Sequence, residues 1–124
     1  MPQFEPQFAP ENLDEFTTDY LIAAEWLLDD EEDRDAIKGW AQSAIEEARR
    51  ACQRFQEENT DDLAAYQRET GYTGGNDFWL TRNRHGAGFW DRGLGETGKR
   101  LTKAADVHGE RDAYRGDDGF LYFA

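Results

Sequence analysis

Apolar side chains recur at helical spacing in the first part of the chain. A first stripe comprises Leu13, Phe16, Tyr20, Ala24 and Leu27. Its spacing predicts a helix that starts at an Asn12 cap, with Glu15 in the capping-box position, and ends near Leu28. A second stripe predicts a second helix after residues 29–33. Its members are Ile37, Trp40, Ala44, Ala48, Ala51 and Phe55.

Two interpretations fit the end of the second helix. In the first, Asn59 and Thr60 break it, so that Thr60 caps a short third helix carrying Leu63 and Tyr66. In the second, the helix continues unbroken to about Arg68. Residues 71–76 predict a turn in either case, because three of the six are glycine.

The chain is rich in glycine and aromatic residues after this point, and 11 of its 12 glycines lie at Gly71 or later. Residues 77–81 and 88–91 are aromatic and predict two strands. Residues 83–86 would join them, with Gly86 supplying the positive φ that such a turn often needs.

A further helix and a hairpin are predicted near the C-terminus. The helix carries apolar positions from Leu94 to Ala105, with His108 on the same stripe, and closes near Gly109. The sequence Gly-Asp-Asp-Gly at residues 116–119 separates two short apolar runs, at 113–115 and 120–123. Such turn residues between apolar runs are a strong hairpin signal.

The predicted order is therefore α-α-(α)-β-β-α-β-β, which is an α+β fold. We expect N-terminal acidic helices packed on a small C-terminal antiparallel sheet with one further helix. The 124 residues suffice for a single domain, 1–124. Within it we expect an extended arm at residues 1–11, which hold all three prolines, an acidic helical part at 12–70 and a β-β-α-β-β part at 76–124.

Charge is distributed unevenly along the chain. Acidic residues outnumber basic ones 27 to 14, so the formal net charge is −13. Residues 1–75 carry 19 acidic and 6 basic side chains, whereas residues 76–124 carry 8 of each. This excess argues against a nucleic-acid backbone or an anionic membrane as the main partner, since both attract cations.

Other features exclude several classes of protein. The single cysteine, Cys52, excludes an internal disulfide framework and a multi-cysteine zinc site, so we expect no metal and no cofactor. No apolar run approaches the length of a membrane span, and Met1 is followed by acidic sequence rather than a basic leader.

Candidate motifs for chemistry are each incomplete. Residues 93–99 have the glycine and lysine spacing of a phosphate-binding loop, but Arg100 stands where a hydroxyl should hold Mg²⁺. Residues 117–119 lack the ligands of a calcium loop. A general base at His85 would need Asp77 or Asp91 to orient its ring, and no serine nucleophile accompanies it. We therefore expect no enzymatic activity.

The acidic residues are the strongest candidates for function. Like charges four residues apart destabilise a helix by about 0.2–0.5 kcal/mol per pair, and pairs such as Glu57/Asp61 and Glu58/Asp62 serve no folding purpose. Solubility or an acid-biased host proteome explains them as well as a surface that binds a basic partner and resembles a phosphate backbone. The candidate contacts are Asp29, Asp30, Glu31, Glu32, Asp33, Glu57, Glu58, Asp61 and Asp62.

Residues 77–92, read as DFWLTRNRHGAGFWDR, resemble a family of small uncharacterised proteins encoded by tailed bacteriophages and prophages. The similarity continues through residues 101–105 and the ending YRGDDGFLY at residues 114–122, and extends loosely to the preceding helices. The family pattern usually has glycine where this chain has Arg84. The resemblance implies a phage origin, expression in the cytoplasm of a bacterial host, and interaction with a host or phage protein.

The leading hypothesis is therefore a phage-encoded binding protein that presents its acidic helices to a basic protein, as a nucleic-acid-mimicking inhibitor of a defence or nucleic-acid-handling system. Binding of nucleic acid or a nucleotide through an aromatic and arginine-rich hairpin at residues 79–92 is the alternative. A hydrolase centred on His85 is a third hypothesis. A possible second contact surface comprises Arg82, Arg84, His85 and Arg92.

Overall fold

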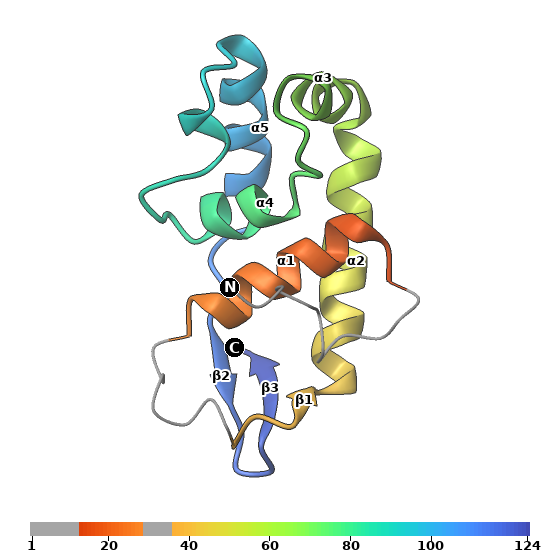
Figure 1. The fold of residues 1–124 in the computed structure, drawn as a ribbon, viewed down its shortest axis with the longest axis vertical. Coiled ribbons are helices and arrows are strands. Elements are labelled where there is room, and N and C mark those ends of the chain that lie inside the picture. Colours follow the sequence, from red (N-terminus) through yellow and green to blue (C-terminus); the bar gives the residue numbers. More distant parts are fainter. Residues whose placement is uncertain (1–12, 29–35) are drawn as a thin grey trace.

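The computed structural model of the chain describes residues 13–28 and 36–124 (Figure 1). Its elements are α1 (Glu15–Trp26), β1 (Gly39–Trp40), α2 (Gln42–Glu58), α3 (Thr60–Thr70), α4 (Gly75–Arg82), the 3-10 turn η2 (Phe89–Asp91), α5 (Glu96–Asp106), β2 (Ala113–Arg115) and β3 (Phe120–Phe123). Helices with one small sheet confirm the predicted α+β class. The predicted arm at residues 1–11 lies outside the described residues. The prediction that Asn12 caps the first helix is wrong, because α1 begins at Glu15 and Asp14 occupies the N-cap position.

The sheet is mixed, whereas an antiparallel sheet was expected. Its strand order is β1-β3-β2, and the predicted C-terminal hairpin forms the antiparallel pair of β2 with β3. β1 pairs parallel to β3, with Trp40 opposite Leu121. The prediction that Ile37 and Trp40 are helical is therefore wrong. Main-chain bonds such as Ala41 N–H to the Leu121 carbonyl, 2.9 Å, hold this segment extended until α2 begins at Gln42.

The second and third helices are separate, which confirms the interpretation that breaks them at Asn59 and Thr60. Asn59 caps α3 with a non-helical φ of −130°. The predicted cap, Thr60, instead donates its hydroxyl back to the Gln56 carbonyl at 3.1 Å. α3 ends at Gly71, whose φ of +78° is the left-handed conformation that glycine adopts without a steric cost.

The strands predicted at residues 77–81 and 88–91 are wrong, because these residues form α4 and η2. Phe78 and Trp79 are buried from a helix rather than from a sheet, and both rings contact Tyr20 of α1. Close packing of α4 on α1 depends on Gly75, since a Cβ there would lie 2.0 Å from the Phe16 carbonyl oxygen. This helix packing overrides the β propensity of the aromatic residues.

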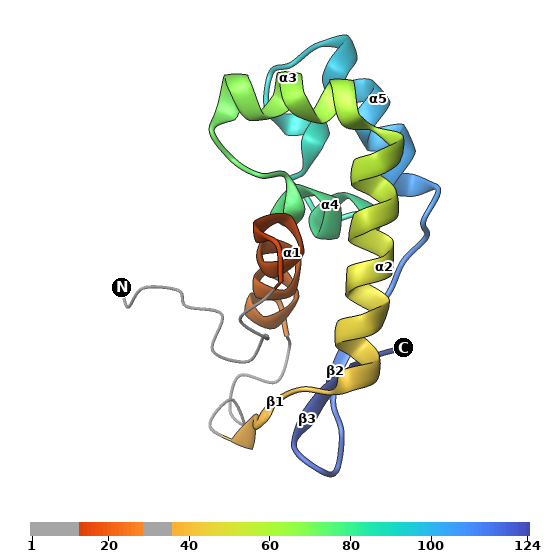
Figure 2. The ribbon, with the colours of Figure 1, turned by 90° about the vertical axis from the view of Figure 1, so that its right-hand side faces the viewer.

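The arrangement of the elements is elongated (Figures 1 and 2). α2 runs along the long axis, with the sheet at one end, α3 and α5 at the other, and α1 and α4 between them. The core follows the same axis, and Phe55 of α2 stacks on Phe78 and Phe89 with ring centroids 4.3 and 5.7 Å apart. Leu101 of α5 and Leu121 of β3 belong to the same buried cluster.

Candidate functional site

The acidic candidates lie partly at the bend between α2 and α3. Asp29, Asp30, Glu31, Glu32 and Asp33 fall outside the described residues. Glu57 and Glu58 are exposed at the end of α2, and Asp61 is exposed at the start of α3. Because the helix breaks between them, Glu57/Asp61 and Glu58/Asp62 are not neighbours on one helix face, and the helical repulsion expected for them does not apply.

Two of these four carboxylates have cationic partners. Arg100 of α5 donates two hydrogen bonds to Asp62, of 2.9 and 2.8 Å, and this lowers the pKa of the Asp62 carboxyl group. Arg54 pairs with Glu58 at 3.1 Å. Glu57 accepts a bond from the neutral Gln53 amide. The acidic bend is thus partly neutralised by arginines, and Glu57 and Asp61 are its exposed anions without a cation paired to them in the part of the chain described.

Arg82 was expected on a contact surface, and that expectation is wrong. Its residue exposure is 6%, and its guanidinium binds inside the protein. It donates to the carbonyls of Gly109 at 2.7 Å and His108 at 2.8 Å, and to the Tyr20 hydroxyl at 2.9 Å. Arg82 therefore fastens the end of α5 to α1 and α4.

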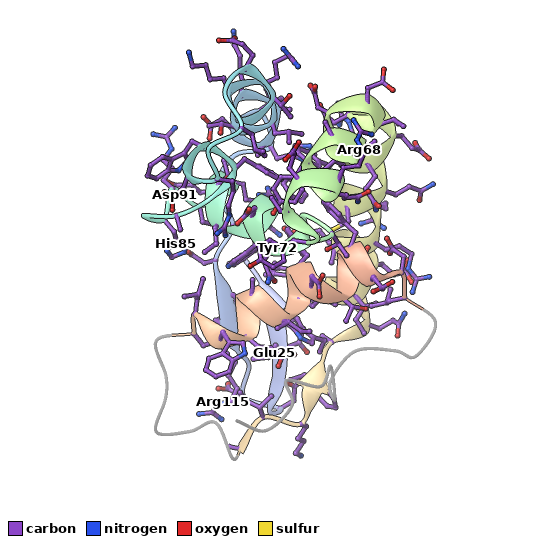
Figure 3. All side chains as sticks on the ribbon, turned by 45° about the horizontal axis from the view of Figure 1, so that its top comes forward. Glu25, Arg68, Tyr72, His85, Asp91 and Arg115 are labelled. Atoms are coloured by element: carbon purple, nitrogen blue, oxygen red, sulfur yellow. The ribbon has the colours of Figure 1, made fainter. Side chains whose placement is uncertain are left out.

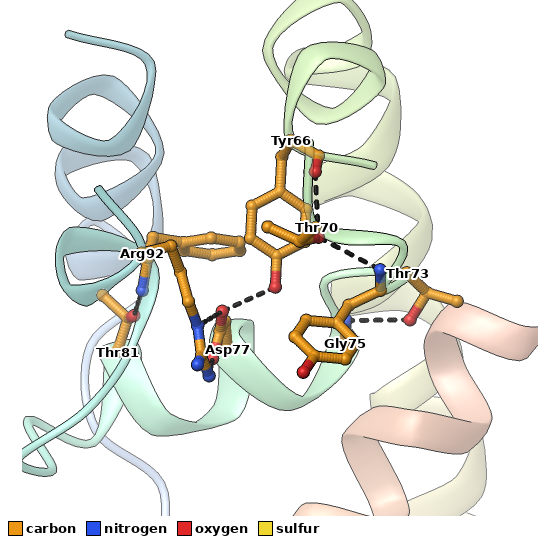
Figure 4. A network of polar contacts seen from close by, with 9 residues as sticks. Tyr66, Thr70, Thr73, Gly75, Asp77, Thr81 and Arg92 are labelled. Atoms are coloured by element: carbon orange, nitrogen blue, oxygen red, sulfur yellow. Dashed lines mark hydrogen bonds and ion pairs between the residues drawn. The ribbon is translucent and has the colours of Figure 1, made fainter. Parts of the chain in front are cut away.

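Arg92 is also held within the molecule (Figure 4). It donates two hydrogen bonds to Asp77, which is 1% exposed, and Tyr66 donates its hydroxyl to the same carboxylate at 2.6 Å. The Asp77 carboxylate raises the pKa of Arg92, while burial and the bond to Asp77 raise the pKa of Tyr66. Asp77 is thereby bonded to Tyr66 of α3 and to Arg92, so it does not orient His85.

Arg84 and His85 are exposed, as a contact surface requires. Arg84 has a left-handed φ of +58° and lies 3.8 Å from Glu110. Within the described residues, no hydrogen bond joins the His85 ring to Asp77 or Asp91. Trp79 is 4% exposed, so it offers no face for stacking a base, and the hairpin on which nucleic-acid binding depended is absent from residues 79–92.

The two loop motifs are structural. Gly95 caps α5, and the Lys99 ammonium of the phosphate-loop-like segment lies 3.3 Å from Glu96. Asp118 accepts bonds from the Phe120 N–H and the Tyr122 hydroxyl, which closes the turn between β2 and β3. Neither segment has the geometry of an ion or phosphate site.

A cleft of about 420 Å³ between α1 and the loop into α4 was not predicted. Glu15 and Asp19 stand one helical turn apart on its α1 wall, and Tyr72 lies on the opposite loop. Asp19 accepts a hydrogen bond from the Thr73 hydroxyl at 2.6 Å. Burial, and to a lesser degree the charge of Glu15, raise the pKa of Asp19. The sequence signal was present, because residues 13–28 contain four acidic and no basic side chains.

A second groove, of about 630 Å³, lies between the end of α1 and the segment that leads into β2. Figure 3 labels two of its lining residues, His85 and Arg115. Its walls combine apolar side chains of α1 with polar side chains of residues 110–115. The indole of Trp79 also lines it.

Other chemistry has little support in the described residues. They contain no group of three His, Cys, Asp or Glu side chains placed to hold a metal ion. Cys52 is fully buried, and burial raises the pKa of its thiol, which makes the thiol unreactive. None of the described helices has the length and apolar character to cross a membrane.

Comparison with protein-family models, curated proteins and solved structures finds no match to this chain. The site therefore has to be interpreted from its own geometry and charge.

Proposed function

We propose that the chain is a small acidic binding protein, not an enzyme, whose partner is a basic host or phage protein. The cleft between α1 and residues 71–77, which comprise a loop and the first turn of α4, is its central contact. The observation that carries this proposal is the charge of the cleft, which is lined by three carboxylates and one guanidinium. Arg92 and Asp77 neutralise each other, so Glu15 and Asp19 leave the cleft negative.

The arrangement of Glu15 and Asp19 is unfavourable for folding alone. The two carboxylates are four residues apart on one helix that carries no basic side chain, and like charges at this spacing cost about 0.2–0.5 kcal/mol. A lysine or arginine side chain from a partner would remove this repulsion. The ring of Tyr72, which already lies under Arg92 at 5.6 Å, adds a face that attracts cations.

Exposed charge at the α2–α3 bend extends the same proposal. Glu57 and Asp61 would attract a basic surface at long range, and residues 29–33 remain candidate contacts of the same sign. A protein groove built for a phosphate backbone has the complementary charge, so inhibition of a defence or nucleic-acid-handling protein is the proposed outcome. Within the proposal, the resemblance of residues 77–92 to phage proteins supports a partner in the bacterial cytoplasm.

Capture from a bacterial host lysate tests the proposal. The bait proteins are the wild type, Glu15→Gln with Asp19→Asn, and a matched control, Glu96→Gln with Asp106→Asn, which changes the same charge on α5. We expect the wild type and the control to retain a basic protein that moderate salt releases and that DNA displaces, and the cleft variant to lose it. Equal retention by the cleft variant, or direct binding of DNA to the wild type, would contradict the proposal.

A further inference from the structure

The groove of about 630 Å³ differs in chemistry from the acidic cleft. Its size falls within the range of roughly 300–1,000 Å³ that is typical of ligand sites. Ala24 of α1 and Leu27 and Leu28, which follow the helix, line the groove together with Tyr114 of β2. The groove therefore joins the C-terminal end of a helix to an edge strand of the sheet.

Trp79, which lines this groove, has an indole N–H without a partner in the described part of the chain. Trp79 is 4% exposed, and its Nε1 is buried without a hydrogen-bond acceptor. The buried indole of Trp40 shows the usual arrangement, since its Nε1 donates to Glu25 at 2.7 Å. Buried N–H groups are nearly always paired, so the unpaired Trp79 Nε1 points to an acceptor that the described residues do not supply.

The rim of the groove is apolar and exposed. Leu27 is 41% exposed and Tyr114 is 46% exposed, although both side chains are large and apolar. Trp26, next to Leu27, is 52% exposed. Clustered exposed apolar side chains are a mark of surfaces that contact another protein.

The charges of the lining groups balance. Two carboxylates, of Glu110 and Asp112, face two guanidiniums, of Arg111 and Arg115. Two of them have partners outside the groove, since Arg111 bonds to Glu47 and Glu110 lies 3.8 Å from Arg84. Asp112 and Arg115 then leave the lining without a net charge. The attraction of a charged occupant to one of these groups would be offset by repulsion from another. The balance therefore favours an uncharged occupant.

From these observations we infer that the groove binds an uncharged apolar segment of a partner polypeptide. One large apolar side chain packs on Leu27 and Leu28, and a backbone carbonyl of the same segment accepts the hydrogen bond of Trp79 Nε1. The site is separate from the acidic cleft, and neither depends on the other.

Selection from a random peptide library on the immobilised full chain tests this inference. We expect uncharged peptides rich in apolar residues to be enriched. Their binding should weaken about threefold to tenfold in Trp79→Phe, which removes one neutral hydrogen bond and keeps an aromatic ring. Leu27→Ser should weaken it similarly, whereas Val107→Ser, an equally polar change at a 79% exposed site outside the groove, should not.

A spectroscopic readout separates a direct bond from an indirect effect. In ¹⁵N-labelled protein, the selected peptide should shift the Trp79 indole N–H resonance and leave that of Trp40 unchanged, because Trp40 already has its acceptor. Trp79→Phe assigns the resonance, and its thermal unfolding shows whether the variant is folded. If Trp79→Phe is not folded, Leu27→Ser still provides the test.

Three results would overturn the inference. The first is enrichment of no peptide, or only of lysine- and arginine-rich peptides that need Glu15 and Asp19, which would leave the proposed function intact. The second is enrichment of apolar peptides that bind Leu27→Ser as tightly as the wild type. The third is self-association that Leu27→Ser abolishes, which would assign the groove to a second copy of the chain.

Discussion

The guanidinium of Arg92 donates two hydrogen bonds, of 2.8 and 2.7 Å, to the carboxylate of Asp77. The pair joins the segment after η2 to α4, and the Tyr66 hydroxyl ties α3 to the same carboxylate. The two partners differ in burial, because the Asp77 side chain is 1% exposed and that of Arg92 is 31% exposed. Loss of Arg92 and loss of Asp77 should therefore differ in their effect on stability.

Replacing Arg92 should destabilise the fold more than replacing Asp77. Arg92→Met leaves a buried carboxylate without its cation, which costs about 3–5 kcal/mol. Asp77→Asn keeps an acceptor for Tyr66, and the freed guanidinium can turn toward solvent, so the cost is about 1–3 kcal/mol. Urea unfolding of both variants measures the difference. Equal losses would show that burial does not determine the energetics of this pair.

Neutralising Asp19 should stabilise the protein at neutral pH. The folded pKa of this carboxyl group is raised above 3.8, so the folded state binds the proton more tightly than the unfolded state does. Stability is then lost as pH rises from 3.8 through the folded pKa. The free energy of unfolding of Asp19→Asn should exceed that of the wild type by about 0.2–0.5 kcal/mol near pH 7, and the two should be equal near pH 3. The variant keeps an oxygen that can accept from Thr73, and a gain that is the same at both pH values would contradict this account.

His108 should make the protein less stable as the solution is acidified. Burial lowers the pKa of its ring below 6.5, and the nearby cations of Arg82 and Arg54 lower it further. The unfolded state therefore takes up a proton first, and stability falls as pH drops through 6.5 toward the folded pKa. His108→Gln should flatten the change in melting temperature between about pH 7.5 and pH 6. An unchanged slope in His108→Gln would contradict this account.

Arg84→Gly should stabilise the loop after α4. The φ of Arg84 is +58°, a conformation that costs a side-chain-bearing residue roughly 1–2 kcal/mol, while glycine costs about 0.5–1 kcal/mol in chain entropy. The expected net gain is therefore about 0.5 kcal/mol in the free energy of unfolding. The ion pair with Glu110 is exposed at 3.8 Å and contributes little. Gly71→Ala, at a φ of +78°, should instead lower the free energy of unfolding. A lower free energy of unfolding in Arg84→Gly would refute the argument.

The residues that the sequence placed well are those whose structure depends on near neighbours. The Gly-Asp-Asp-Gly turn forms its hairpin through bonds that stay within a few residues, such as Gly116 N–H to the Phe120 carbonyl. The helix break at Asn59 and the left-handed cap at Gly71 are likewise local.

The candidate site was predicted less well, because a cation's role depends on which carboxylate it meets. Arg82, Arg84 and Arg92 are the same type of residue and lie close together in the sequence. Only the fold brings Arg82 to the end of α5 and Arg92 to Asp77, and so removes both from the surface. Glu15 and Asp19 line a cleft only because residues 71–77, a loop and the first turn of α4, return to α1.

From its sequence alone, this chain is determined to be an acidic α+β protein with helices first and a hairpin last, since periodicity, turn residues and charge are local properties. The tertiary structure decided that residues 77–81 are helical and that Trp40 lies in a strand. Both outcomes follow from contacts with distant segments, of Phe78 with Tyr20 and of Trp40 with Leu121. Burial against those partners outweighs local propensity, and no pattern within a short window contains that information.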